Sequence, residues 1–154
     1  MKTETERIQK LIKNSWDGFM WHGNNLKEAL NGVNAEIAFR KPAAGAHNIY
    51  ELVMHLYCWR NFVYQHLAGN ADYKVEINSA VDWPTQYEKT EASWNEALQL
   101  LEKNQSDLTE AFAKITEAQL DESMHGRKFT WYDFAHGIVE HDIYHSAQIA
   151  ILKK

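Results

Sequence analysis

The chain has 154 residues, of which 45% are hydrophobic, so its length suits one domain (residues 1–154) with a buried core. Its 16 basic and 21 acidic residues give a formal charge of −5, and this balance excludes the positive field with which proteins bind nucleic acid. The single cysteine, the charged N-terminus without an apolar signal sequence, and the lack of any stretch with the ~20 apolar residues of a membrane span predict a cytoplasmic protein that does not bind membranes.

The first predicted helix begins near the N-terminus. Thr3 and Glu6 can form a capping box, and apolar residues then recur with a period near 3.6 as far as about Trp21. Residues 23–45 are interrupted by glycine and proline. They therefore predict a long connection with at most brief helical turns.

The second predicted helix opens with another capping pair, Asn48 and Glu51, and continues with regularly spaced apolar residues to Gly69. Residues 70–83 lack a regular pattern and predict a second irregular connection. Pro84 suits the first turn of a helix, where its missing N–H has no intrahelical partner in any case. We therefore expect the third helix to begin there.

The third and fourth predicted helices complete the chain. From Tyr87 to Ile115 a stripe of mainly apolar residues follows alternating steps of four and three, the 3.5-residue repeat that is typical of bundle packing. Thr130 and Asp133 then form a third capping pair, from which the last helix continues to the C-terminus. Four amphipathic helices without a strand pattern predict an all-α fold, a four-helix bundle whose long connections allow crossovers.

The last predicted helix carries two histidines, His141 and His145, one helical turn apart. At about 100° per residue both point toward the apolar face that contains Ile138, whereas His136 falls on the opposite side. Two imidazoles at this spacing can hold one metal ion, but a stable site normally needs at least three protein donors. The remaining histidines must therefore be searched for a third ligand.

His55 is the preferred third ligand, because it lies in the middle of the second helix among core residues, and bundle metal sites are built from facing helices. His66 lies about 16 Å farther along the same helix and His47 about 12 Å before His55, so neither can share an ion with it. His22 and His125 fall at a helix end or in a loop and rank lower. The spacing therefore favours His55 together with the two histidines of the last helix.

Other residues near these histidines have competing interpretations. Gln148 shares a flank of the last helix with the first of its two inward histidines, where it can orient a ligand or contact a substrate. Asp142 is either a carboxylate that orients an imidazole or accepts a proton, or a polar residue at the edge of the core. Glu51 is interpreted as a capping partner, Trp59 as a packing residue and Cys58 as a small buried hydrophobe.

Three segments of the chain resemble the DinB/YfiT-like superfamily: residues 21–26 (WHGNNL), 47–59 (HNIYELVMHLYCW) and 137–149 (GIVEHDIYHSAQI). The resemblance implies a four-helix bundle, often dimeric, that holds a divalent metal ion through three histidines. These map onto His55, His141 and His145. The chain departs from the family at Ser146 and Ala147, where members often have Ala-Gly before the glutamine, and this change does not touch the ligands.

Three imidazole ligands favour Zn²⁺, Ni²⁺ or Fe²⁺ and leave coordination positions for water or substrate. Because the family includes thiol-dependent transferases and isomerases, with hydrolase activity proposed for other members, the resemblance implies a metal-dependent enzyme of the thiol-transferase or hydrolase type. Its expected partners are a small-molecule substrate, with a low-molecular-weight thiol as one candidate, and a second copy of the chain in a homodimer. The alternative is a non-catalytic metal-binding or structural dimeric bundle. That alternative predicts a closed site, whereas an enzyme predicts an open cleft over the imidazoles.

Overall fold

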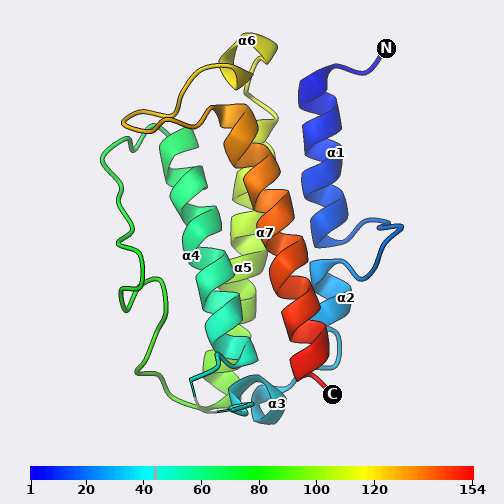
Figure 1. Cartoon of the computed structure of the whole chain (residues 1–154), viewed down its shortest axis with the longest axis vertical. Coiled ribbons are helices and arrows are strands. Elements are labelled where there is room, and N and C mark those ends of the chain that lie inside the picture. Colours follow the sequence, from blue (N-terminus) through cyan, green and yellow to red (C-terminus); the bar gives the residue numbers. More distant parts are fainter. Residues whose placement is uncertain (44) are drawn as a thin grey trace.

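The computed structural model describes residues 1–43 and 45–154, and these residues form seven helices and no strand of a sheet. Ala44, which falls in the predicted connection 23–45, lies outside the described residues. Four long helices pack side by side, and three short ones lie in the connections (Figure 1): α1 (Glu4–Trp16), α2 (Leu26–Leu30), α3 (Ala35–Phe39), α4 (Ile49–Leu67), α5 (Glu91–Phe112), α6 (Glu117–Leu120) and α7 (Trp131–Leu152). The predicted all-α four-helix bundle is therefore confirmed. Among the helices described, none has both the length and the apolar character that crossing a membrane requires.

The three predicted capping boxes all form, and they fix where α1, α4 and α7 begin. The side chains of Thr3, Asn48 and Thr130 accept hydrogen bonds from backbone N–H groups three residues later, at 3.2, 2.9 and 3.2 Å. In each case the acidic side chain at that third position accepts a bond from the backbone N–H of the cap. Such caps satisfy N–H groups that have no partner inside the helix, and each contributes about 1 kcal/mol.

Helix α1 is shorter than predicted, because it ends at Trp16 instead of continuing to about Trp21. The chain turns away at Gly18, whose N–H donates to the carbonyl of Lys13 at 3.1 Å. A side chain at this position would place its Cβ 2.8 Å from the Cα of Asn14, so the close turn requires glycine. Trp21 is 86% exposed and takes no part in the apolar stripe that suggested a longer helix.

Helix α5 begins later than predicted, at Glu91, and Pro84 lies in the irregular connection before it. Thr90 caps the helix and accepts a hydrogen bond from the N–H of Ser93 at 3.1 Å. Tyr87, the first residue of the predicted repeat, instead packs outside the helix. The local cap therefore determines the boundary, and the 3.5-residue repeat overestimates the length of the helix at this end.

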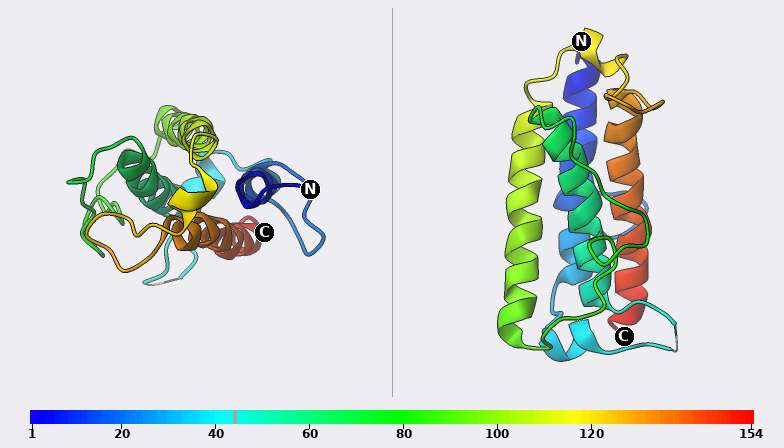
Figure 2. Two further views of the ribbon diagram at one scale, coloured as in Figure 1. Left: turned by 90° about the horizontal axis from the view of Figure 1, so that it is seen from above. Right: turned by 90° about the vertical axis from the view of Figure 1, so that its left-hand side faces the viewer.

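Helices α4 and α5 run in the same direction, so the connection between them must return along the length of the bundle (Figures 1 and 2). Residues 68–90 form this returning crossover, which passes along the outside of α4. Helix α7 runs opposite to α4 and packs against it. The expectation that the long connections include a crossover is confirmed, and the predicted brief helical turns are α2 and α3.

The interior consists of two apolar clusters with a polar layer between them. One cluster includes Ile12, Phe62 and Leu108, and the other includes Leu56 and Leu101. Along each long helix the polar layer falls between members of the two clusters, and its buried members are Ser15, His55, Arg60, Asn104, Gln105, Asp142 and His145. The candidate site lies in this layer, where helices α4 and α7 face each other.

Asp142 occupies the enclosed side of the polar layer. Its Oδ2 lies 2.5 Å from Nη1 of Arg60, both side chains have 0% exposure, and Ser15 donates a hydrogen bond to the same oxygen at 2.9 Å. The guanidinium also donates to Gln105 and Asn104 of α5. Neither expectation for Asp142 holds, because it contacts no imidazole through its carboxylate and is no edge residue. It is one half of a buried ion pair that joins α4 to α7.

Candidate metal centre

Three imidazoles meet where α4 and α7 pack together. Nε2 of His55 and Nε2 of His145 each lie 3.0 Å from Nε2 of His141. The three nitrogen atoms lie within 4.8 Å of one another, and His55 and His145 are buried. Helical spacing brings the two histidines of α7 together, and packing of α4 against α7 adds the third. The structure therefore assembles the same three histidines that the sequence favours.

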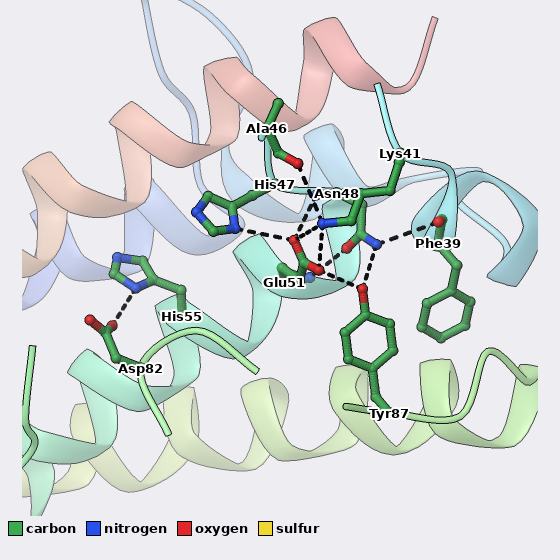
Figure 3. Close-up of polar contacts among 9 residues, drawn as sticks. All are labelled: Phe39, Lys41, Ala46, His47, Asn48, Glu51, His55, Asp82 and Tyr87. Carbon is green, nitrogen blue, oxygen red and sulfur yellow. Dashed lines mark hydrogen bonds and ion pairs between the residues drawn. The ribbon is translucent and has the colours of Figure 1, made fainter. Parts of the chain in front are cut away.

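Asp82 fixes the ring of His55. Its Oδ1 lies 2.6 Å from Nδ1 of His55, and Nε1 of Trp59 donates to the same oxygen at 2.8 Å (Figure 3 shows the His55–Asp82 pair). The backbone N–H of Asn78 donates to the other carboxylate oxygen at 2.8 Å. A carboxylate accepts the Nδ1 proton, so Nε2 of His55 presents its lone pair to the cluster. Trp59 therefore does more than pack, because its indole N–H orients the carboxylate.

Gln148 plays the same part for His145. Its Oε1 lies 2.7 Å from Nδ1 of His145 and accepts the proton of that nitrogen. This leaves the lone pair of Nε2 of His145 directed at the cluster. Of the two roles expected for Gln148, the structure thus supports the orientation of an imidazole.

Burial keeps the three imidazoles neutral. It lowers the pKa of His141 to about 3, with further lowering from the neighbouring His145 and His55. Burial also lowers the pKa of His55, against the opposing effect of Asp82, and it lowers the pKa of His145. Metal ions bind the neutral form of imidazole, so the cluster is in the required state at neutral pH.

The donor set fits a divalent transition-metal ion. His141 can donate at most one Nε2 proton, which cannot satisfy the lone pairs of both His55 and His145 at 3.0 Å. A shared cation satisfies all three nitrogens, and a separation of 3.0 Å suits two nitrogens that each lie about 2.1 Å from one ion. Imidazole donors are those that Zn²⁺, Ni²⁺ and Fe²⁺ accept.

A cleft of about 640 Å³ opens beside the cluster, and all three histidines line it. The ring of Trp83, from the crossover, stacks on His55 with 3.8 Å between ring centroids and 9° between planes. Most of the other walls are apolar: Ala46, Leu52, Tyr144, Ile151 and Leu152. The imidazoles are therefore reached from an open, largely apolar space that can hold a small molecule.

The remaining histidines lie outside the cluster, although one of them shares its cleft. Nε2 of His66 lies 3.0 Å from the carbonyl oxygen of Tyr73, and the ring of His136 packs beside Tyr132. His47 lines the cleft but contacts Trp83 and Glu51 instead of the cluster. His66 and His136 thus lie outside the cluster as predicted. His47 is also no member of it, but it lies closer to His55 than the predicted distance of about 12 Å, because α4 begins only at Ile49 and both rings stack on Trp83.

Cys58 is a buried residue of α4, as expected. Burial raises the pKa of its thiol to about 11, so the sulfur stays protonated at neutral pH. A protonated thiol is a poor nucleophile. Cys58 therefore packs as a small apolar side chain.

Asp82 and Trp83 are the two contributors to the site that sequence reasoning missed. Both belong to the crossover 68–90, where periodicity carries no information about neighbours in space. The available signal for a functional role was that an acidic and an aromatic residue stand next to each other directly before Pro84. Only the path of the crossover along α4 reveals that the pair reaches His55.

The fold and the site define a four-helix-bundle protein with a three-histidine candidate metal centre beside an open cleft. The chain belongs to the DinB superfamily, whose family model matches residues 19–149, and members of this superfamily generally bind metal. The resemblance noted in the sequence is thereby confirmed. Neither a curated protein nor a solved structure matches the chain.

Proposed function

We propose that this protein is a divalent-metal-dependent enzyme in which His55, His141 and His145 hold the ion and a small-molecule substrate binds in the adjoining cleft. The observation that carries the proposal is the cleft itself, because all three histidines form part of its wall. A storage or structural site predicts an enclosed cluster, so the open access favours catalysis over the non-catalytic alternative.

The bound ion, Zn²⁺, Ni²⁺ or Fe²⁺, supplies a Lewis acid that promotes ionisation of a nucleophile, either water in a hydrolase or a low-molecular-weight thiol in a transferase. The chain's own residues prepare that chemistry. Asp82 and Gln148 hold two of the imidazoles in the required tautomer. Trp83 and Leu52 line the cleft with apolar surface that can receive the apolar part of a substrate.

Metal analysis tests the proposed ligands. After reconstitution with zinc and removal of free ion, we expect about one zinc per wild-type chain and almost none in His55→Ala, His141→Ala or His145→Ala. Far-ultraviolet circular dichroism should show unchanged helix content in all of them. His22→Ala is the matched control, because His22 is an exposed histidine outside the cleft. Full zinc retention in the His55 variant contradicts the assignment.

Two probe reactions separate the proposed enzyme types. Hydrolysis of p-nitrophenyl acetate measures the hydrolase reaction, and coupling of mercaptoethanol to chlorodinitrobenzene measures thiol transfer. Each should depend on the loaded ion and be lost in His141→Ala. If the zinc, nickel and iron forms are all no faster than the metal-free protein on either probe, the non-catalytic alternative is favoured. Light scattering measures the homodimer, which is part of the same proposal.

A further inference from the structure

A buried carboxylate at the start of α4 is surrounded by donors (Figure 3). The two oxygens of Glu51 each lie 2.7 Å from Nζ of Lys41, and the hydroxyl of Tyr87 donates to Oε1 at 2.5 Å. Burial by itself raises the pKa of Glu51, but hydrogen bonds from Lys41, Tyr87, Asn48 and His47 outweigh it and lower the pKa. Glu51 is therefore ionised at neutral pH and is far more than the capping partner that the sequence suggested.

Glu51 also fixes the tautomer of His47. Its Oε2 lies 3.1 Å from Nδ1 of His47, and because a carboxylate only accepts, Nδ1 carries the proton. In the neutral imidazole, Nε2 of His47 then has a free lone pair. The side chain of His47 is 42% exposed, whereas that of Glu51 is 6% exposed. The pair thus combines a buried orienting carboxylate with an accessible imidazole base.

The ring of His47 faces the same cleft as the cluster. It stacks on Trp83 with 3.7 Å between centroids and 15° between planes, and the indole also stacks on His55. His47 and His55 are therefore only two stacking distances apart, on either side of one indole. A substrate seated in the cleft can touch both His47 and the cluster.

The nitrogen atoms of the three clustered histidines are not available to accept a proton from a substrate. Its three Nε2 atoms are the candidate ligand atoms, and Nδ1 of His55 and of His145 are engaged by Asp82 and Gln148. Among the described residues that line the cleft, His47 and Tyr144 are the titratable groups outside the cluster. Imidazole is the most frequent proton-transfer group of enzyme sites, so His47 is the candidate acceptor.

We propose that His47, positioned by Glu51, is the proton-transfer residue of this site, tested on carboxylic esters as the probe substrates. This inference rests on the proposed function. The O–H or S–H bond of the nucleophile breaks as its proton moves to Nε2 of His47, and the remaining electron pair forms the bond to the ester carbonyl carbon. When the carbon–oxygen bond to the leaving group breaks, that oxygen takes the proton from Nε2. The imidazole returns to its neutral form, and the products are an acid or thioester and an alcohol.

Two esters with different leaving groups test this role in the zinc-loaded protein. We expect His47→Ala to lower kcat/KM for phenyl acetate by about 100-fold or more. The loss should be smaller for p-nitrophenyl acetate, whose leaving group departs without a proton. Added imidazole should restore part of the activity of His47→Ala, but not that of His47→Gln, where the amide fills the space. His22→Gln is the control variant.

Zinc content separates a catalytic role from a structural one. We expect His47→Ala and His47→Gln to bind as much zinc as the wild type, because neither removes a cluster nitrogen. Loss of zinc in both variants overturns the proposal, and so does phenyl acetate turnover that stays within about threefold of the wild type.

The tautomer of His47 provides a readout that does not depend on turnover. Nitrogen NMR of histidine-labelled, zinc-loaded protein at neutral pH should show His47 protonated at Nδ1 and unprotonated at Nε2. A proton on Nε2 overturns the proposal whatever the activity. If the loaded wild type hydrolyses neither ester yet binds zinc at the three histidines, the ester reaction fails while the metal assignment stands.

Discussion

His141 and Asp142 are consecutive residues of α7, yet they belong to two opposite kinds of polar site. Asp142 points into the bundle and meets the guanidinium of Arg60, with no exposure on either side chain. His141 points toward a cleft and meets two other imidazoles. The carboxylate of Asp142 is neutralised by the opposite charge of Arg60. The three imidazoles instead bring nitrogen atoms of the same kind together. Lone pairs that converge on one point without a donor for each of them indicate a ligand from outside the chain.

The largest expected difference between the two sites is in how much each contributes to the free energy of unfolding without metal. Removing one member of a buried ion pair leaves the other charge without a partner, so Asp142→Ala should lower the free energy of unfolding by about 3–5 kcal/mol. Urea denaturation measures the change. Lys103→Ala, which breaks an exposed pair with Asp107, is the control and should cost less than about 1 kcal/mol. Equal effects of the two substitutions contradict the comparison.

The three-histidine cluster should instead make the stability of the protein depend on metal. Zinc at about 100 times its dissociation constant should raise the free energy of unfolding by about 2.7 kcal/mol, because the ion binds the folded state preferentially. The shift should vanish in His145→Ala and on addition of a chelator, as followed by urea denaturation of each form. An equal shift in wild type and variant would show that zinc acts elsewhere.

Asp82 should raise the zinc affinity of the three-histidine cluster without being a metal ligand itself. Because it orients His55 through a 2.6 Å contact, Asp82→Ala should weaken zinc binding by about 10–100-fold, measured in competition with a chromophoric chelator. Asp72→Ala removes an exposed carboxylate from the same crossover and should leave the affinity unchanged. Similar affinities for the two variants would remove Asp82 from the site.

The smallest expected effect concerns Glu51, which, like Asp142, is a buried carboxylate with a cationic partner. Its pKa in the folded protein lies below the ordinary value of 4.5, so its contribution to stability is complete above that pH and is lost as the pH falls through the folded pKa. In chelator, acidification should therefore destabilise the wild type more than Glu51→Gln. Urea midpoints at neutral pH and below pH 4.5 measure the difference, and parallel curves would contradict it.

Features encoded locally could be predicted from the sequence. The caps at Thr3, Asn48 and Thr130 identified helix starts, because a capping box involves residues only three apart. The histidine pair of α7 and its inward direction follow from helical geometry alone. The roles of His55, His141 and His145 as metal ligands remain predictions, although their convergence is a property of the structure.

Features that depend on the path of the chain could not be predicted. The end of α1 depends on how tightly the backbone turns at Gly18, and the start of α5 depends on Thr90, a cap that the repeat pattern concealed. Asp82 lies 27 residues from His55 in an irregular segment, so no period connects them. The role of Asp142 depends on its partner Arg60, which lies 82 residues away on α4, so the pairing depends on the packing of α4 against α7.

The crossover 68–90 lies outside the packed helices, yet its Asp82 orients His55 and its Trp83 lines the cleft. Most of the cleft wall, including the histidines of the cluster, comes from α4 and α7, whereas Trp83 comes from a segment that contributes few residues to the two apolar clusters. A protein engineer can therefore vary Trp83, keeping Asp82, to change which molecules the cleft accepts while the helices that carry the imidazoles stay unchanged.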